Sequence, residues 1–164
     1  MVARELAVSG IRIERRAFVT GGLCALALPA GAQALQLEVW RDPNCGCCAG
    51  WVEHIRREGF AVTDRIVASV SPFRRMLGTP IDLLSCHAAQ IDGLAIEGHV
   101  PALAIRRMLA ERTPEVAGIA VPAMPIGTPG MEIEGREPEI YSVVAWNRDG
   151  SFWPWLRMRG GSVV

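Results

Sequence analysis

Three of the five cysteines of this chain lie within four positions, in the segment DPNCGCCAGW (residues 42–51). The segment follows the alternating, strand-like LQLEVW (35–40) and precedes the helical pattern AGWVEHIRREG (49–59). Backbone N–H groups at a helix N-terminus stabilise thiolates, and both metal binding and disulfide chemistry use the thiolate. The sequence therefore predicts a fold with a cysteine site at a strand-to-helix junction.

The rest of the chain continues to alternate between strand and helix patterns. Hydrophobic periodicity predicts a strand at 60–67, a short helix at 71–78, two strands within 85–100 and an amphipathic helix at 101–112. Asp92-Gly93 divides the two strands and is typical of a type I′ hairpin turn, because both residues accept positive φ values.

The C-terminal third is predicted as a loop followed by a hairpin. The stretch 118–140 is rich in glycine and proline, which indicates a long loop, and 141–155 has the pattern of a β-hairpin. Half of the residues are hydrophobic and 21% are charged, a composition that can bury one core. The predicted fold class is α/β and thioredoxin-like, with a central mixed sheet, flanking helices and a C-terminal hairpin.

The N-terminal region has the pattern of an export signal. A basic stretch, a short apolar run and the small-residue segment AGAQA follow one another, and the pair Arg15-Arg16 is typical of twin-arginine signals. We expect a cleaved signal at 1–34 and a thioredoxin-like metal-binding domain at 35–164. The mature protein is expected in the periplasm, without a membrane association after cleavage. Cysteines retained in that oxidising compartment would form disulfides or a protected site.

Charge gives no indication of a nucleic-acid partner. All 17 basic side chains are arginines, they balance 17 acidic ones, and they are scattered along the chain. A nucleic-acid-binding domain would gather basic residues on one face. We therefore expect no nucleic acid among the partners.

A fourth cysteine is expected to join the cluster. In thioredoxin and glutaredoxin relatives, the strand facing the reactive cysteines begins with a cis-proline, five residues before the hairpin turn in the glutaredoxin pattern VPxxxIDG. His87 holds that position here. Cys86 and His87 would thus replace the pair that normally faces a CxxC motif, bringing Cys86 against the cluster. The loss of the proline also removes the element on which oxidoreductases dock a substrate peptide.

Three motifs together resemble the CopG-like family of exported metal-binding proteins, in the order of that family. They are NCGCCAGWVEHIRREGF (44–60), SCHAAQIDGLAIEGHVPA (85–102) and GIAVPAMPIGTPGME (118–132). The resemblance implies a thioredoxin-like fold that binds copper through the CxCC thiolates, as a polynuclear Cu(I)-thiolate cluster, with interconversion of Cu(I) and Cu(II) as a further expectation. It also implies a role in copper handling or resistance, with copper ions and other periplasmic copper-handling proteins as partners.

The chemistry of the residues agrees with copper. Cu(I) is soft and prefers sulfur ligands, and the adjacent side chains of Cys47 and Cys48 diverge, so each would bind a different metal in a bridged cluster. Sequestration of metal is expected rather than turnover of an organic substrate. The predicted metal ligands are Cys45, Cys47, Cys48, Cys86 and His87.

Two other functions remain open. One is a thiol-disulfide oxidoreductase in which Cys45 attacks and Cys48 resolves; Cys47→Ser would spare this activity and cripple copper loading. The other is a structural zinc site, whose loss would unfold the domain.

Several other side chains have alternative roles. Because neighbours alternate along a strand, His87 could point away from Cys86. His99 is expected to cap a helix or lie at the surface, with metal ligation as the alternative, and His54 is expected to be solvated. The loop is expected to form a proline-stiffened lid, in which Met124 and Met131 pack or donate a thioether. Trp40 and Trp51 are expected to pack beside the cluster.

Overall fold

The computed structural model describes residues 34–164. All but the last residue of the predicted signal at 1–34 lies outside this part, so cleavage and export remain predictions. No helix among the described residues is long and apolar enough to cross a membrane. The elements, in chain order, are β1 (Gln36–Arg41), α1 (Gly46–Arg57), β2 (Ala61–Ile66), α2 (Ser71–Leu77), the 3-10 turn η1 (Ile81–Leu83), β3 (Ala88–Ile91), β4 (Leu94–Glu97), α3 (Ala102–Glu111), β5 (Val116–Ala120), β6 (Ile140–Asn147), β7 (Phe152–Arg159) and β8 (Ser162–Val163).

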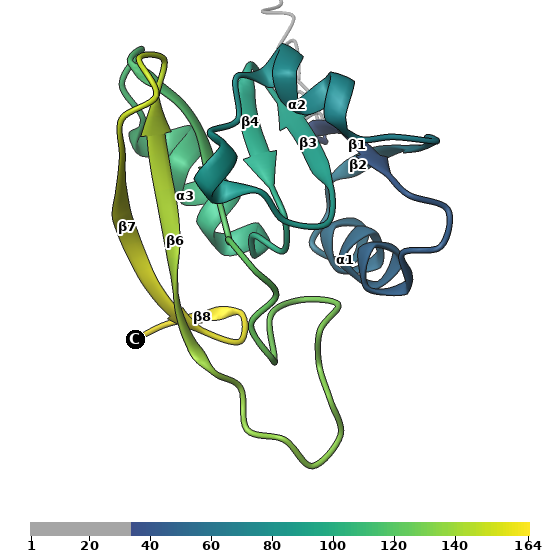
Figure 1. Cartoon of the computed structure of the whole chain (residues 1–164). Coiled ribbons are helices and arrows are strands. Elements are labelled where there is room, and N and C mark those ends of the chain that lie inside the picture. The colour runs from purple at the N-terminus through teal and green to yellow at the C-terminus, as the bar shows by residue number, and fades with distance from the viewer. Residues whose placement is uncertain (1–33) are drawn as a thin grey trace, which may run out of the picture. The chain divides into compact units, whose positions relative to one another are not determined.

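One mixed sheet runs through residues 34–164 in the strand order β2-β1-β3-β4-β5-β6-β7-β8 (Figure 1). The strands β1 and β2 are parallel, as are β4 and β5, and the other neighbouring pairs are antiparallel. The β1-α1-β2 unit followed by the β3-β4 hairpin and α3 is the arrangement of a thioredoxin-like domain. The predicted α/β fold class is confirmed, and β5 to β8 extend the sheet on the side of β4.

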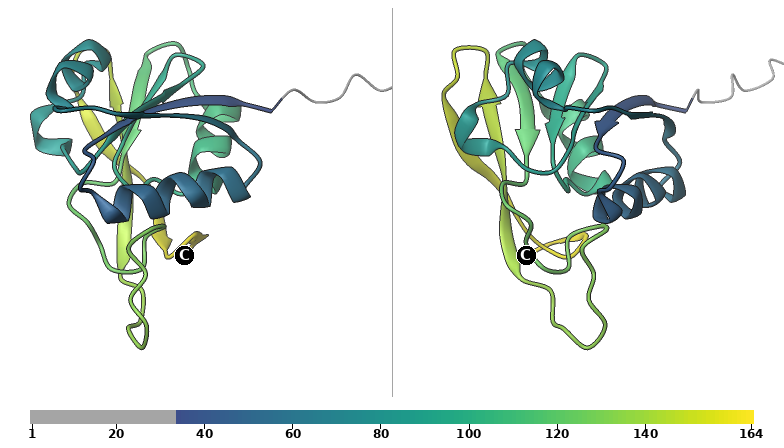
Figure 2. Two further views of the ribbon diagram at one scale, coloured as in Figure 1. Left: turned by 90° about the vertical axis from the view of Figure 1, so that its right-hand side faces the viewer. Right: turned by 45° about the vertical axis from the view of Figure 1, so that its right-hand side comes forward.

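The helices are divided between the two faces of the sheet (Figure 2). Helices α1 and α3 share one apolar cluster with alternate side chains of the strands, including Leu37 and Ile96. Helix α2 belongs to the other face, where the ring of Phe73 stacks on Trp40 with centroids 4.8 Å apart. Alternation along the strands thus produces two apolar layers from one sheet.

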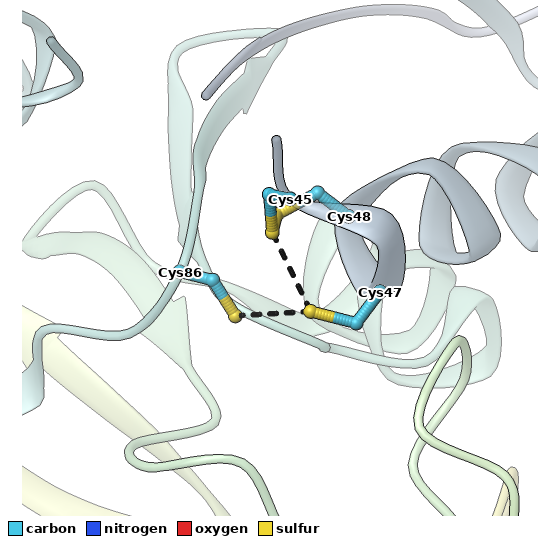
Figure 3. A group of neighbouring side chains, drawn as sticks. All are labelled: Cys45, Cys47, Cys48 and Cys86. Carbon is cyan, nitrogen blue, oxygen red and sulfur yellow. Dashed lines mark hydrogen bonds between the residues drawn. A yellow bond between two sulfur atoms is a disulfide. The ribbon is translucent and has the colours of Figure 1, made fainter. Parts of the chain in front are cut away.

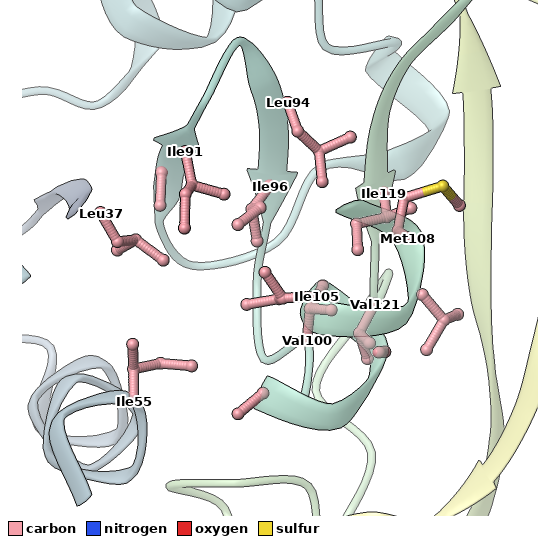
Figure 4. Packing of buried hydrophobic residues seen from close by; sticks show 14 of the residues in the cluster. Leu37, Ile55, Ile91, Leu94, Ile96, Val100, Ile105, Met108, Ile119 and Val121 are labelled. Carbon is pink, nitrogen blue, oxygen red and sulfur yellow. The ribbon is translucent and has the colours of Figure 1, made fainter. Parts of the chain in front are cut away.

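The larger apolar layer fixes the position of α1. Val52 and Ile55 of this helix are buried against β1, β3 and α3, and Figure 4 shows Ile55 facing Leu37 and Ile105. These residues recur at the spacing of one helix face, which is why the segment folds as an amphipathic helix on the sheet. The N-terminal end of α1, which carries the cysteines, is held at one edge of this core.

Two details of the predicted fold have clear outcomes. The hairpin turn is confirmed, since Asp92 and Gly93 have φ values of 46° and 70°. The predicted loop at 118–140 was placed too early, because Val116–Ala120 forms strand β5 and pairs with both β4 and β6. The error arose because Gly118 was interpreted as a loop residue. Gly118 lies under the ring of Trp146, where any Cβ would fall 2.3 Å from the indole. This glycine is therefore needed for close packing within strand β5 and does not form a turn.

Candidate metal centre

The CxCC motif lies at the N-terminus of α1. This helix begins at Gly46, three residues before the helical pattern predicted at 49–59. Cys45 is the N-cap residue, and Cys47 and Cys48 lie in the first turn, with basic residues in the last turn. This arrangement puts the sulfurs at the positive end of the helix dipole. Cys45 and Cys48 form a disulfide, and Cys48 is fully buried.

Four sulfur atoms converge at this helix end (Figure 3). The Sγ of Cys47 lies 3.4 Å from that of Cys45 and 3.9 Å from that of Cys86. All four Sγ atoms lie within 4.8 Å of one another. The predicted convergence of Cys86 on the CxCC motif is confirmed. Within residues 34–164, the cysteines outside the disulfide are Cys47 and Cys86.

A buried ion pair holds the segment that carries Cys86. The carboxylate of Glu97, at the end of β4, is fully buried and accepts the backbone N–H of Ser85 at 2.7 Å. Arg74 of α2 donates to this carboxylate at 2.8 Å and also to the backbone carbonyl of Ser85. Both backbone groups of Ser85 are therefore fixed by one charged pair, which limits the movement of the neighbouring cysteine.

His99 faces Cys86, and its predicted role as a helix cap or surface residue is wrong. Its Nε2 lies 3.0 Å from the Sγ of Cys86, its Nδ1 lies 2.8 Å from the carbonyl oxygen of Pro129, and the side chain is fully buried. The hairpin register could have revealed this contact. Ala88 pairs with Glu97 across the two-residue turn, and continuing that register by two residues sets Cys86 opposite His99.

His87 is buried beside the same sulfur. Its ring lies 4.3 Å from the ring of Trp51 and 5.1 Å from that of His99, measured between centroids. Neither ring nitrogen of His87 has a hydrogen-bond partner, although both are buried. The ligand atoms of Cys86, His87 and His99 lie within 4.8 Å of one another. His87 therefore does not point away from Cys86.

Burial favours the neutral forms of Cys86, His87 and His99. Desolvation, with a contribution from the nearby Cys47, raises the pKa of Cys86 to about 11. Desolvation also lowers the pKa of His99, and lowers that of His87 well below its ordinary value. The expected stabilisation of thiolates does not extend to Cys86, because this residue lies on the strand side and burial dominates. Without a bound metal, Cys86 is a thiol and both histidines are neutral imidazoles.

The loop after β5 closes over the helix end. A Cβ at Gly130 would lie 2.5 Å from the carbonyl oxygen of Cys47 and 2.6 Å from the backbone nitrogen of Trp51. The adjacent Pro129 holds His99. This contact supports the predicted lid, while Met124 is half exposed.

The prediction for His54 needs correction, and the two tryptophans near the motif have defined contacts. His54 is not simply solvated: its Nε2 accepts the backbone N–H of Ala102 at 3.2 Å and so caps α3. Trp51 packs beside His87 as expected, and its indole N–H donates to the carbonyl of Val100. Trp40 stacks on Phe73 of α2, on the other face of the sheet from the α1 core.

The fold and this centre define a thioredoxin-like protein with a sulfur- and imidazole-rich group of potential metal ligands. Residues 83–131 match a family described as "Protein of unknown function, DUF411". A comparison with curated proteins found no significant match.

Two solved structures, described as forms 2 and 1 of "Copper resistance protein copG", resemble this chain. Form 2 is 43% identical with a TM-score of 0.71, and the match covers 77% of this chain and 99% of that one. Form 1 is 41% identical with a TM-score of 0.71, and the match covers 78% and 100%. The chain belongs to the DUF411 family of CopG-like proteins, as its motifs indicated.

Proposed function

We propose that this protein binds copper in the periplasm and so contributes to copper handling or resistance. The observation that carries the proposal is the convergence of four sulfurs within 4.8 Å of one another. Thiolates in that number and proximity suit Cu(I), which is soft and takes two or three sulfur ligands. The description of the CopG structures as a copper resistance protein supports the same metal.

The donor set fits several copper ions better than one. The Sγ of Cys47 lies between those of Cys45 and Cys86, at 3.4 and 3.9 Å, so its thiolate is placed to bridge ions held on either side. One tetrahedral ion would need all four sulfurs to point at a common centre, whereas bridging thiolates can join several ions. We infer a polynuclear Cu(I)-thiolate cluster held by Cys45, Cys47, Cys48 and Cys86, with His87 as an adjacent nitrogen ligand.

The disulfide must open before all four sulfurs can bind. A dithiol reductant would supply two electrons and two protons to Cys45 and Cys48 and would itself become a disulfide. Copper would then displace the thiol protons. The thiol of Cys86 is a weak acid, because burial raises its pKa to about 11. The metal must therefore compete with the proton for this sulfur.

A second candidate function is thiol-disulfide exchange, favoured by the Cys45–Cys48 disulfide itself. Cys45 is partly exposed and Cys48 is buried, the arrangement of an attacking and a resolving cysteine. Against this function, no cis peptide bond occurs among the described residues, and His87 takes the place of the proline that docks substrate peptides.

Cu(I) titration of the reduced chain tests the two functions. The reduced wild type is expected to bind two or more Cu(I) per chain, with the four thiols of residues 34–164 protected from alkylation. Cys47→Ser should lower the bound copper and leave thiols open to alkylation, because the sulfur between Cys45 and Cys86 is lost. Reduction of a protein disulfide, assayed on the same samples, provides the comparison. A wild type that takes up no Cu(I) but reduces disulfides, with Cys47→Ser equally active, would refute the copper proposal.

A further inference from the structure

A second group of potential ligands shares Cys86 with the four sulfurs. It consists of Cys86, His87 and His99, whose ligand atoms lie within 4.8 Å of one another. Two donors of one ion lie at most about 4.4 Å apart, since metal–nitrogen and metal–sulfur bonds are about 2.0 to 2.3 Å long. The upper limit of 4.8 Å on the separation of these three ligand atoms is thus close to the spacing that one shared ion requires.

His99 is already oriented as a ligand. The carbonyl oxygen of Pro129 can only accept, so the Nδ1 atom of His99, 2.8 Å away, carries the proton and donates it. The lone pair is then on Nε2, 3.0 Å from the Sγ of Cys86. Metal-bound histidines usually fix their second nitrogen in this way, through a carbonyl or carboxylate.

His87 supplies an independent indication of a ligand. Its side chain has no exposed surface, and neither ring nitrogen has a hydrogen-bond partner. An unsatisfied buried polar group destabilises the folded state, and most buried polar groups in native proteins have a partner. Trp51 and His99 pack against this ring and leave its nitrogens unbonded. A metal ion beside Cys86 would give one of them a partner.

We propose that Cys86, His87 and His99 form a distinct three-ligand site for a single Cu(II) ion, next to the four-sulfur group. One thiolate and two imidazoles suit Cu(II), whereas an all-sulfur set suits Cu(I). None of these three residues belongs to the Cys45–Cys48 disulfide, so this site is complete while that disulfide is closed. The inference deepens the proposed function, on which it rests for the identity of the metal, by giving Cu(II) a nitrogen-rich ligand set that shares Cys86 and His87 with the Cu(I) cluster.

The test uses the Cys47→Ser chain with its disulfide closed, in which Cys86 is the free thiol of residues 34–164. Co(II) serves as a probe that does not oxidise thiols, and Cu(II) follows. We expect one Co(II) per chain with a thiolate-to-metal charge-transfer band. With Cu(II), electron paramagnetic resonance should show coupling to two nitrogens.

Histidine substitutions identify the ligands. In that background, His87→Gln and His99→Gln are each expected to weaken Co(II) binding by about tenfold or more and to leave one coupled nitrogen. His54→Gln is the matched control, because His54 caps α3 and lies outside both donor groups; it should retain the band and both nitrogens. Circular dichroism checks the fold of each variant. If a histidine variant does not fold, the number of nitrogens coupled to Cu(II) in the Cys47→Ser chain itself tests the site: two nitrogens support it.

Three results would overturn the site. They are the absence of Co(II) binding to the disulfide-closed parent, binding without the sulfur band, and an equal loss of affinity in His54→Gln. Cu(I) loading of the reduced wild type is measured separately and tests the four-sulfur cluster. Failure of that loading alone would refute the cluster, and failure of the Co(II) experiment alone would refute the three-ligand site.

Discussion

At the scale of single residues, burial favours the neutral forms of Cys86, His87 and His99. His87 is the extreme case, because it has no exposed surface and no hydrogen-bond partner. Desolvation lowers its pKa most, and Coulombic interactions with His99, Arg74 and Arg41 lower it further. Proton uptake by this ring is therefore strongly disfavoured in the folded chain.

The burial of His87 predicts acid sensitivity of the metal-free chain. An unfolded histidine binds a proton below a pH of about 6.5, whereas folded His87 does not, so stability is present above that pH and is lost as the pH falls. Because only the unfolded chain protonates this histidine, the unfolding free energy should fall by about 2 kcal/mol between pH 7 and pH 5. Urea unfolding at both pH values measures the loss, and His87→Phe should reduce it by that amount. The same pH dependence in both chains would contradict the argument.

At the scale of elements, the centre depends on contacts between segments far apart in sequence. Helix α1 brings three sulfurs, the β3-β4 hairpin brings Cys86 and His99, and the loop before β6 supplies the carbonyl of Pro129. The loop meets α1 most closely at Gly130, whose φ is +84° and whose Cβ position falls between backbone atoms of Cys47 and Trp51. The close approach of loop and helix requires glycine.

We expect Gly130→Ala to displace the loop and to lower stability by more than 2 kcal/mol, because the added methyl meets backbone atoms that cannot rotate away. Gly135→Ala is the matched control: its φ is +74°, but nothing lies within 4 Å of its Cβ position. This variant should lose only the cost of a left-handed alanine, about 1 to 2 kcal/mol. Thermal unfolding of both variants provides the measurement, and equal losses would show that the contact with α1 adds nothing.

Sequence reasoning recovered the elements that have a strong local signal. The strand-to-helix position of the CxCC motif, the Asp92-Gly93 turn and the return of Cys86 followed from short patterns. The contact of His99 with Cys86 required the hairpin register to be continued beyond the strand ends. The capping role of His54 could not be predicted, because it joins α1 to the start of α3 across 48 positions of the chain.

At the scale of the whole molecule, the four cysteines lie beside the main apolar cluster and are not part of it. Apolar side chains of α1, α3 and the sheet fill the main layer, and the free thiols of Cys47 and Cys86 lie outside that layer. Burial of this extent supplies the main driving force for folding. The domain is therefore expected to fold without metal, unlike a structural zinc domain.

Treatment of the purified chain with a chelator tests this expectation. The far-ultraviolet circular dichroism and the cooperativity of thermal unfolding should persist, because the apolar layers remain intact. Added copper should raise the midpoint by mass action, since it binds the folded state preferentially. Collapse of the dichroism on chelation would instead support the structural zinc alternative.

The dispersal of the donors along the chain also bears on the order of events in the cell. The CxCC segment, the Cys86–His99 hairpin and the loop at Pro129 are joined only after the sheet has formed. A nascent or extended polypeptide offers copper at most the three neighbouring thiols of the motif, and a completed domain offers the full set. On the proposed function, the full set of copper ligands would form only once folding has finished.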